Sequence, residues 1–311
     1  MGVKDVQVEE IWSMDSDIKA HEDVYGLVFL FKWENTQENK DEKDQQQDET
    51  LQRKQKEDLN TTQGVFFAQQ IVPNACATQA ILSILLNNKA VDIGEQLGEF
   101  KAFTTDLPPD MRGLALSNSE MIKKVHNSFG KQHMLIQDDP SGDKDADSFH
   151  FVAYVPIKDS VYELDGLKPG PIFVDKINQP NDKTSWIDAA VEEIRRRMES
   201  FQGEEIRFNL MAVVKDKRVM YKEKIGQLEK QLESAQAENI DNADQSTPAT
   251  LLIHQELDEL KRELVYENEK FDTYHIENAR RKHNFFPLAF NLLKAMASKG
   301  VLEEAMNKAK K

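Results

Sequence analysis

The chain has 311 residues, a length that suits one large domain with an appendage, or two domains. Charged residues make up 31% of it, the net charge is −15 and the mean hydropathy is −0.63, so part of the chain must be solvated. The negative charge argues against nucleic-acid binding through phosphate contacts, and the single cysteine excludes an intramolecular disulfide framework and a cysteine-rich zinc site. Because it has neither a signal-type leader at Met1 nor an apolar run of transmembrane length, the sequence predicts a soluble intracellular protein without a membrane partner.

The first clear element is the apolar run Val24–Trp33, which is bounded by polar stretches and predicts a buried strand. The segment 34–60 has no periodicity, no aromatic residue and many Gln, Glu, Asp and Lys residues, so we expect a disordered insertion there. Structure resumes with the short segment 65–72. The nearly continuous apolar residues of 74–88 then predict a central, buried helix.

A second helix is predicted ahead of the next strands. Ser117 and Glu120 have the spacing of a capping box, which marks a helix start. The apolar residues that follow have helical spacing and form one face: Met121, Ile122, Val125 and Phe129.

The middle of the chain predicts three strands. An acidic loop containing Gly and Pro, 137–148, comes first. Strands are then expected at 149–157 and 161–167, on either side of a turn, and at 205–214. Residues 185–201 have the pattern of an amphipathic helix.

From Lys217 onward the pattern is helical. Two runs carry apolar residues at alternating spacings of about three and four, as in short coiled coils: Tyr221, Ile225, Leu228 and Leu232, then Ile253, Leu257, Leu260, Leu264, Phe271 and Tyr274. The end of the chain reads as an amphipathic helical pair with a break at Gly300. We therefore predict a mixed α/β domain over 1–216 and an all-helical extension over 217–311.

The single cysteine, Cys76, lies at the predicted start of the helix over 74–88. A lone cysteine is most often a small buried hydrophobe. At a helix start, however, unpaired backbone N–H groups and the helix dipole stabilise a thiolate. Gln70 lies just upstream, where its amide could donate to an oxyanion together with the backbone N–H of Cys76.

A catalytic thiolate needs a base and a group that orients the base. His150 lies within a predicted strand of aromatic and β-branched residues, where a satisfied core histidine is the competing interpretation. If the hairpin turns at Lys158–Asp159, then Asp165 is the diagonal neighbour of His150 on the same face of the sheet. Glu163 is also a candidate on that face, so the residues alone leave both carboxylates open.

Three sequence blocks together carry a resemblance to a known family: Gln69–Asn87, Leu114–Ile122 and the pair Phe149–Ile157 with Val161–Ile172. In this order they resemble the ubiquitin C-terminal hydrolases, a group of papain-like cysteine deubiquitinases. The helical tail, including Tyr274–Lys294, further resembles that of the proteasome-associated member. The resemblance covers nearly the whole chain.

The resemblance implies an α/β (α+β) papain-like fold, with a central antiparallel sheet flanked by helices, and hydrolysis of the bond after the C-terminal glycine of ubiquitin. It implies that Cys76 is the nucleophile, His150 the general base, Asp165 the residue that orients it, and Gln70 the oxyanion-hole glutamine. The loop 137–148 matches the crossover loop over the active site. No cofactor and no metal is expected.

The resemblance also implies partners for the tail. These are the ubiquitin-receptor subunit of the proteasome and a subunit of a chromatin-remodelling complex, which would place the protein in the cytoplasm and nucleus. The tail carries more apolar residues than one helix needs for its own packing, which favours a partner surface: Phe285, Phe286, Leu288, Phe290, Leu292 and Leu293.

One departure from the family pattern concerns the start of the chain. The family normally has a Trp-containing strand and a short helix before the block Val6–Trp12, which here follows almost at once after Met1. We therefore expect lower domain stability and weaker ubiquitin binding. The alternative function is a non-catalytic ubiquitin-binding scaffold, against which the set of Cys76, His150, Asp165 and Gln70 argues.

Overall fold

The computed structural model describes most of the chain, in these ranges: 1–21, 23–32, 64–130, 149–177, 182, 184–200, 208–238 and 248–309. The expected disordered insertion at 34–60 and the expected crossover loop at 137–148 lie outside the described residues, as does Trp33.

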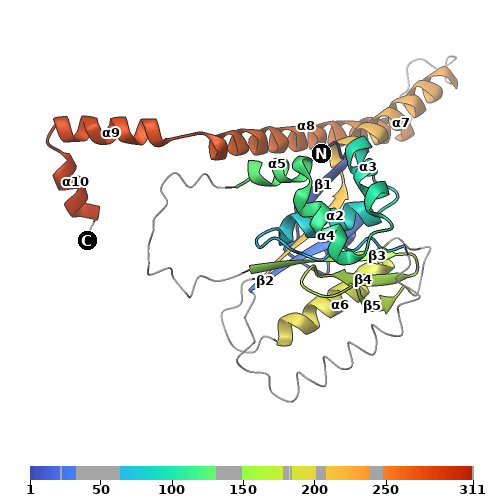
Figure 1. Cartoon of the computed structure of the whole chain (residues 1–311). Helices are drawn as coiled ribbons and strands as arrows, with labels where there is room; N and C mark the ends of the chain where they lie inside the picture. The colour runs from blue at the N-terminus through green and yellow to red at the C-terminus, as the bar shows by residue number, and fades with distance from the viewer. Residues whose placement is uncertain are drawn as a thin grey trace.

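A six-stranded antiparallel sheet is the centre of the fold (Figure 1), in the order β1-β6-β2-β3-β4-β5. The strands are β1 (Val6–Glu10), β2 (Val24–Lys32), β3 (Phe149–Ile157), β4 (Ser160–Leu164), β5 (Ile172–Lys176) and β6 (Asn209–Lys215). The predicted strands and the antiparallel sheet are confirmed. The two strands that the sequence did not reveal, β1 and β5, are the edges of the sheet. Neither strand shows the apolar pattern of a core strand, because Gln7 is the one buried residue of β1 and no residue of β5 is buried.

Helices cover both faces of the sheet (Figure 1). On one face lies α2 (Cys76–Asn87), and on the other lies α6 (Ser185–Ser200). A further layer covers the outer side of α2 and consists of α3 (Gly94–Thr104), α4 (Pro109–Asn118) and α5 (Glu120–Ser128).

Two core clusters hold α2 from opposite sides. Ala80 and Ile84 pack toward the sheet, whereas Leu82 and Leu86 pack toward α3, α4 and α5. The prediction of a central, buried helix is thus confirmed. The helix that carries Cys76 is fixed in the core rather than lying on the surface.

The expected capping box of Ser117 and Glu120 is wrong, because Glu120 is the first residue of α5 and not the third. Ser119, not Ser117, is the N-cap of α5, and its hydroxyl accepts from the backbone N–H of Ile122. Ser117 belongs to the last turn of α4, where its hydroxyl donates to the carbonyl of Gly113. Because α4 and α5 follow one another with a single residue between them, the capping signal of one helix overlaps the end of the other.

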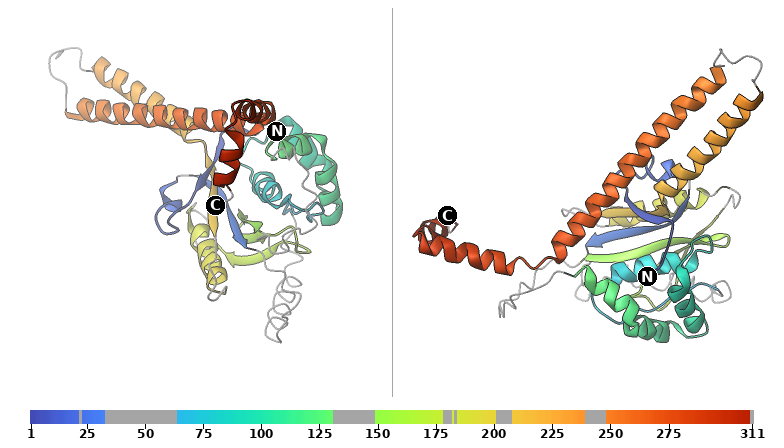
Figure 2. Two further views of the ribbon diagram at one scale, coloured as in Figure 1. Left: turned by 90° about the vertical axis from the view of Figure 1, so that its left-hand side faces the viewer. Right: turned by 90° about the horizontal axis from the view of Figure 1, so that it is seen from above.

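The extension is helical, as predicted, and consists of α7 (Lys217–Glu238), α8 (Pro248–Lys282), α9 (Phe286–Ser298) and α10 (Leu302–Ala309). α7 and α8 lie side by side in all views (Figures 1 and 2), with Ile225 and Leu257 buried between them. Gly300, in the left-handed region at φ +70°, separates α9 from α10. Within the described ranges, no helix combines the length and the apolarity needed to cross a membrane.

A buried polar network joins β3, β4 and α6. The Tyr154 hydroxyl donates to Glu163 Oε2 at 2.9 Å, and Arg197 Nη1 donates to Glu163 Oε1 at 2.8 Å. The Arg197 guanidinium also lies 4.3 Å from the ring centroid of Phe31. The Glu163 side chain is only 6% exposed, so its ion pair with Arg197 is largely buried.

This network predicts that Arg197→Met lowers the free energy of unfolding by about 3–5 kcal/mol, because it leaves the buried Glu163 carboxylate without its partner. Chemical denaturation monitored by circular dichroism measures the change. The matched control is Arg195→Met on the same helix, whose exposed partner Asp15 implies a loss of only about 0.2–1 kcal/mol. Equal losses of unfolding free energy in the two variants would contradict the role of Arg197 as the ion-pair partner of Glu163.

Candidate active site

Cys76 is the first residue of α2 and is half-buried. The turn ahead of it contains Asn74, which adopts a left-handed backbone with φ 65°, a conformation that Asn tolerates better than most residues. Ala75 is the N-cap and supplies no side-chain hydrogen bond to the first turn. The first backbone N–H groups of α2 are therefore not occupied by a capping side chain, which favours negative charge at this helix end.

His150 and Asp165 meet through the register of the β3–β4 hairpin. Ile157 pairs with Ser160, so the turn is at Lys158–Asp159 as predicted. His150 Nε2 lies 2.7 Å from Asp165 Oδ1, and both side chains are buried. The predicted pairing of these two side chains is confirmed.

The surroundings of Asp165 decide between the two carboxylates that the sequence left open. Strand β4 ends at Leu164, earlier than expected, and Asp165 opens a turn in which its backbone carbonyl accepts from Lys168 N–H. Its Oδ1 also accepts from the backbone N–H of Leu167 at 3.0 Å. Glu163, in contrast, is used by Tyr154 and Arg197.

The electrostatics favour a thiolate–imidazolium pair. Burial of the sulfur raises the pKa of Cys76, but hydrogen bonds from the His150 side chain and from the backbone N–H groups of Phe151 and Ala77 more than offset this and hold it below its ordinary value. Burial lowers the pKa of His150, whereas hydrogen bonds to Asp165 and Cys76 raise it, with a net value of about 9. Because Nε2 is engaged by Asp165, Nδ1 is the ring nitrogen left for the thiol.

The charge of Asp165 completes this arrangement. Burial raises the pKa of the Asp165 carboxyl, but the hydrogen bond from His150 holds it below its ordinary range. An ionised Asp165 fixes the His150 ring and stabilises its protonated form. The arrangement can therefore supply a nucleophilic sulfur and a proton donor at neutral pH.

Gln70 lies beside the turn that carries Asp165, because its backbone N–H donates to the carbonyl of Gly166 at 2.8 Å. Its side-chain Nε2 donates to the carbonyl of Val72 at 3.2 Å, and its Oε1 is buried without a partner among the described residues. An amide nitrogen carries two hydrogens, so one remains for a further acceptor. The structure thus brings Gln70 to the same corner of the fold as Asp165.

Residues that the sequence did not single out surround the first turn of α2. Thr78 Oγ1 lies 2.8 Å from His126 Nδ1 on α5. Gly113 on α4 lets the segment ahead of Cys76 pass closely, since a Cβ there would lie 1.9 Å from the carbonyl oxygen of Gln69. The sequence predicts no helix over 109–118, so nothing in its pattern indicated this close approach.

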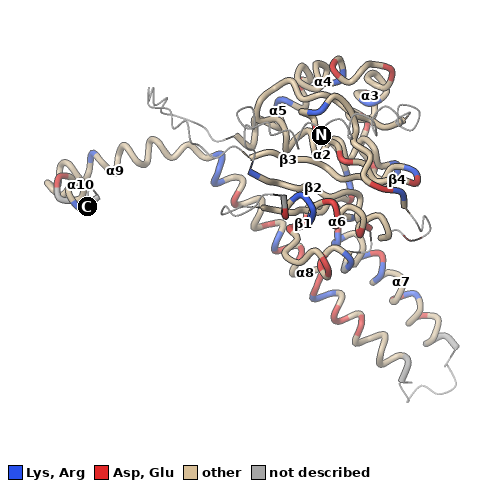
Figure 3. Tube along the Cα trace, turned by 90° about the horizontal axis from the view of Figure 1, so that it is seen from below, with Lys and Arg blue, Asp and Glu red and all other residues tan. Residues whose placement is uncertain are grey.

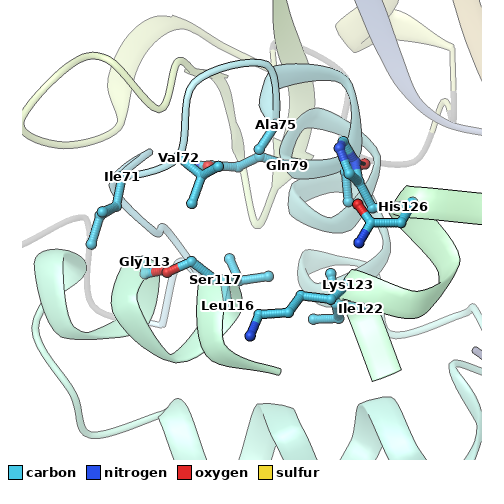
Figure 4. A pocket seen from close by; sticks show the side chains of 12 residues that line it. Ile71, Val72, Ala75, Gln79, Gly113, Leu116, Ser117, Ile122, Lys123 and His126 are labelled. Atoms are coloured by element: carbon cyan, nitrogen blue, oxygen red, sulfur yellow. Dashed lines mark hydrogen bonds between the residues drawn. The ribbon is translucent and has the colours of Figure 1, made fainter. Parts of the chain in front are cut away.

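A cavity of about 220 Å³ opens next to this turn (Figure 4). Figure 4 shows Ile71 and Val72 on one side, Ser117, Leu116 and Lys123 on the opposite side, and His126 at the far end. Within the described part of the chain, no group of three or more His, Cys, Asp or Glu residues is placed to hold a metal ion.

Comparisons with known proteins find matches along most of this chain. The profile of the family "Ubiquitin carboxyl-terminal hydrolase, family 1" matches residues 1–199, and a second profile, "Ubiquitin carboxyl-terminal hydrolases", matches residues 257–302. The chain is 39% identical over 330 residues to ubiquitin carboxyl-terminal hydrolase isozyme L5 of Dictyostelium discoideum, an alignment that covers 100% of this chain and 90% of that relative.

Two solved structures are also similar. The crystal structure of Trichinella spiralis UCH37 bound to ubiquitin vinyl methyl ester has a TM-score of 0.61 and 32% identity, and covers 88% of this chain and 90% of that one. The catalytic domain of the same protein, also bound to ubiquitin vinyl methyl ester, has a TM-score of 0.52 and 39% identity, and covers 69% and 87% of the two chains. The chain therefore belongs to the ubiquitin carboxyl-terminal hydrolase family 1, the cysteine hydrolases of ubiquitin C-termini.

Proposed function

We propose that this chain hydrolyses the bond after the C-terminal glycine of ubiquitin, with Cys76 as the nucleophile. One observation carries the proposal. Cys76 begins a buried helix and interacts with His150, and His150 is in turn hydrogen-bonded to Asp165. The relative from Trichinella spiralis, whose fold this chain shares, binds a ubiquitin vinyl methyl ester. This supports ubiquitin as the substrate.

The mechanism follows from the roles that the geometry allows. The Cys76 thiolate attacks the carbonyl carbon of the terminal glycine, and its sulfur forms a bond to that carbon as the carbonyl π electrons move to oxygen. The backbone N–H of Cys76 and the remaining amide hydrogen of Gln70 stabilise the oxyanion. When the oxyanion collapses, the bond to the leaving amine breaks and His150 donates its proton to that amine.

A second half-reaction restores the enzyme. Neutral His150 removes a proton from water, and the resulting hydroxide attacks the thioester carbon. The carbon–sulfur bond then breaks, which releases the terminal glycine as its carboxylic acid and Cys76 as the thiolate. The acid loses its proton to solvent, and His150 keeps the proton taken from water. Asp165 holds the imidazole ring in place through both halves and does not itself transfer a proton.

The nucleophile assignment predicts that Cys76→Ala reduces turnover of a fluorogenic ubiquitin C-terminal amide by at least about a thousandfold. The same variant should lose covalent labelling by a ubiquitin probe with an electrophilic C-terminus, as shown by intact-protein mass spectrometry. Retained ubiquitin binding in calorimetry would show that the fold is intact. A chain that binds ubiquitin but is not labelled even with Cys76 present would be a scaffold and not an enzyme.

The raised pKa of His150 predicts where kcat/KM falls on the alkaline side of its pH profile, its alkaline limb. The imidazolium is present below its pKa of about 9 and is lost as the pH rises through that value, so kcat/KM should fall there. Asp165→Asn removes the largest contribution that raises this pKa, and the limb should move to lower pH. At neutral pH, kcat/KM should fall on the order of a hundredfold.

Steady-state kinetics from neutral to alkaline pH measure both effects. The matched control is Asp175→Asn on β5, an exposed carboxylate that should leave the profile unchanged. An unchanged alkaline limb in Asp165→Asn would refute the assigned role of Asp165.

We further propose that the C-terminal helices bind a partner, the ubiquitin-receptor subunit of the proteasome or a subunit of a chromatin-remodelling complex. Such partners would place the protein in the cytoplasm and nucleus. No residue of α9 is buried, although six large apolar side chains of the segment are at least half exposed: Phe285, Phe286, Leu288, Phe290, Leu292 and Leu293. Figure 3 shows that α9 carries far fewer charged positions than α8. An exposed apolar helix of this kind supports a protein-binding role.

This proposal predicts that a chain ending at Lys282, without α9 and α10, hydrolyses small ubiquitin adducts within about twofold of the full chain, because Cys76, His150 and Asp165 lie in the sheet domain. The same truncation should abolish co-purification with the receptor subunit. The paired change Phe286→Ser and Phe290→Ser should reproduce the loss in the full chain. The equally exposed pair Val265→Ser and Tyr266→Ser on α8 is the control. Undiminished co-purification of the truncated chain would contradict the proposal.

A further inference from the structure

Three segments of the active site meet at the side chain of Gln79. This residue lies one turn after Cys76 on α2, and its backbone N–H makes an early helical bond to the carbonyl of Ala75. Its side-chain Nε2 donates to the carbonyl of Ala68, in the segment that leads to Gln70. Gln79 is 9% exposed, so its side-chain amide makes this hydrogen bond in a buried position.

The third segment is the turn that carries Asp165. A Cβ added to Gly166 would lie 2.4 Å from Gln79 Nε2 and 2.8 Å from Gln70 Cβ, so both glutamines pack directly on the Gly166 backbone. The φ angle of Gly166 is not positive, so the glycine is needed here for space and not for a left-handed backbone. Gln70 is bonded to the same glycine through its own backbone N–H.

Core packing does not require a polar residue at this position. Apart from Ser83, the buried neighbours of Gln79 on α2 are apolar, and a buried amide is tolerated only when its hydrogen bonds are made. What the amide adds is a directional link from α2 to the segment at Ala68, at the end of the helix where Cys76 lies.

We propose that Gln79 is a positioning residue, which sets the places of Gln70 and Asp165 relative to Cys76 through its bond to Ala68 and its contact with Gly166. The inference rests on the hydrolase mechanism proposed above. Gln79 touches none of the reacting atoms. It acts on the reaction only through the residues that do, and a shift of about 1 Å in such residues costs on the order of a hundredfold in rate.

The chain contains a matched control for this role. Asn87, at the other end of α2, also links the helix to the segment ahead of Cys76, because its side chain exchanges hydrogen bonds with the backbone N–H and carbonyl of Phe66 at 2.7 and 2.8 Å. Both amides join the same two segments, but only Gln79 contacts the turn of Asp165.

The experiment compares Gln79→Met with Asn87→Leu in the full chain. Gln79→Met should lower kcat for a fluorogenic ubiquitin C-terminal amide by about ten- to a hundredfold, with KM within about twofold. Asn87→Leu should lower the melting temperature but leave kcat within about twofold of the unaltered chain. Equal falls of kcat in the two variants, or no fall in Gln79→Met, would overturn the proposal.

A second readout does not depend on ubiquitin. The rate of Cys76 alkylation by iodoacetamide, followed against pH, reports the fraction of thiolate held by the pair with His150. Gln79→Met should raise the apparent pKa of this reaction, because Asp165 no longer holds His150 in place, and Asn87→Leu should leave it unchanged. In Gly166→Ala the added methyl group would displace the Gln79 side-chain amide. This variant should therefore raise the apparent pKa of Cys76 alkylation as Gln79→Met does.

The two readouts separate this inference from the function on which it rests. If the unaltered chain shows no ubiquitin turnover, the proposed hydrolase function fails. The alkylation profile still decides whether Gln79 positions the Cys76–His150 pair. An unshifted profile in both Gln79→Met and Gly166→Ala would overturn the role of Gln79, even in an active hydrolase.

Discussion

The hydrogen bond between His150 and Asp165 depends on the register of one hairpin, and most of the site depends on that bond. A slip of one residue between β3 and β4 would place the two side chains on opposite faces of the sheet. Two features oppose such a slip. Lys158 adopts a left-handed backbone in the tight turn, and Tyr154 pairs with Glu163 across the strands, where Arg197 binds the same carboxylate. The network that stabilises the hairpin therefore also aligns His150 with Asp165.

The sulfur reaches this pair because α2 lies close to the sheet. Gly26 on β2 faces α2, and a Cβ at this position would lie 2.7 Å from the side chain of Ile84. The absence of a side chain at Gly26 thus sets how closely the helix approaches, and the packing of Leu82 and Leu86 against the outer helices holds it there. Because α2 packs against the sheet on one side and the outer helices on the other, it cannot shift without losing core contacts. Packing therefore fixes the position of Cys76 as much as hydrogen bonds do.

The sequence revealed those parts of the site that repeat a local pattern. The residue pattern of β3 and β4 predicted two strands, and the turn assumed at Lys158–Asp159 has the observed register. The apolar run after Cys76 predicted a buried helix, and the tail predicted paired helices. The edge strands β1 and β5 were missed because few of their side chains are buried, and Ser117 was mistaken for the cap because two helices meet there. Gln79 and Gly166 lie far apart in the chain, and only the tertiary fold brings them together.

The helices of the C-terminal extension differ in how they contact the sheet domain. α8 is bound to the sheet domain, because Lys270 Nζ donates to Glu9 Oε1 on the edge strand β1 at 2.6 Å and the buried Glu267 lies between Lys270 and Lys217. α9, in contrast, buries none of its residues on the rest of the chain. The first part of the extension thus belongs structurally to the domain that carries Cys76. The apolar side chains of α9 are exposed, so a partner of the kind proposed above, bound at α9, need not disturb the ion pair between α8 and β1.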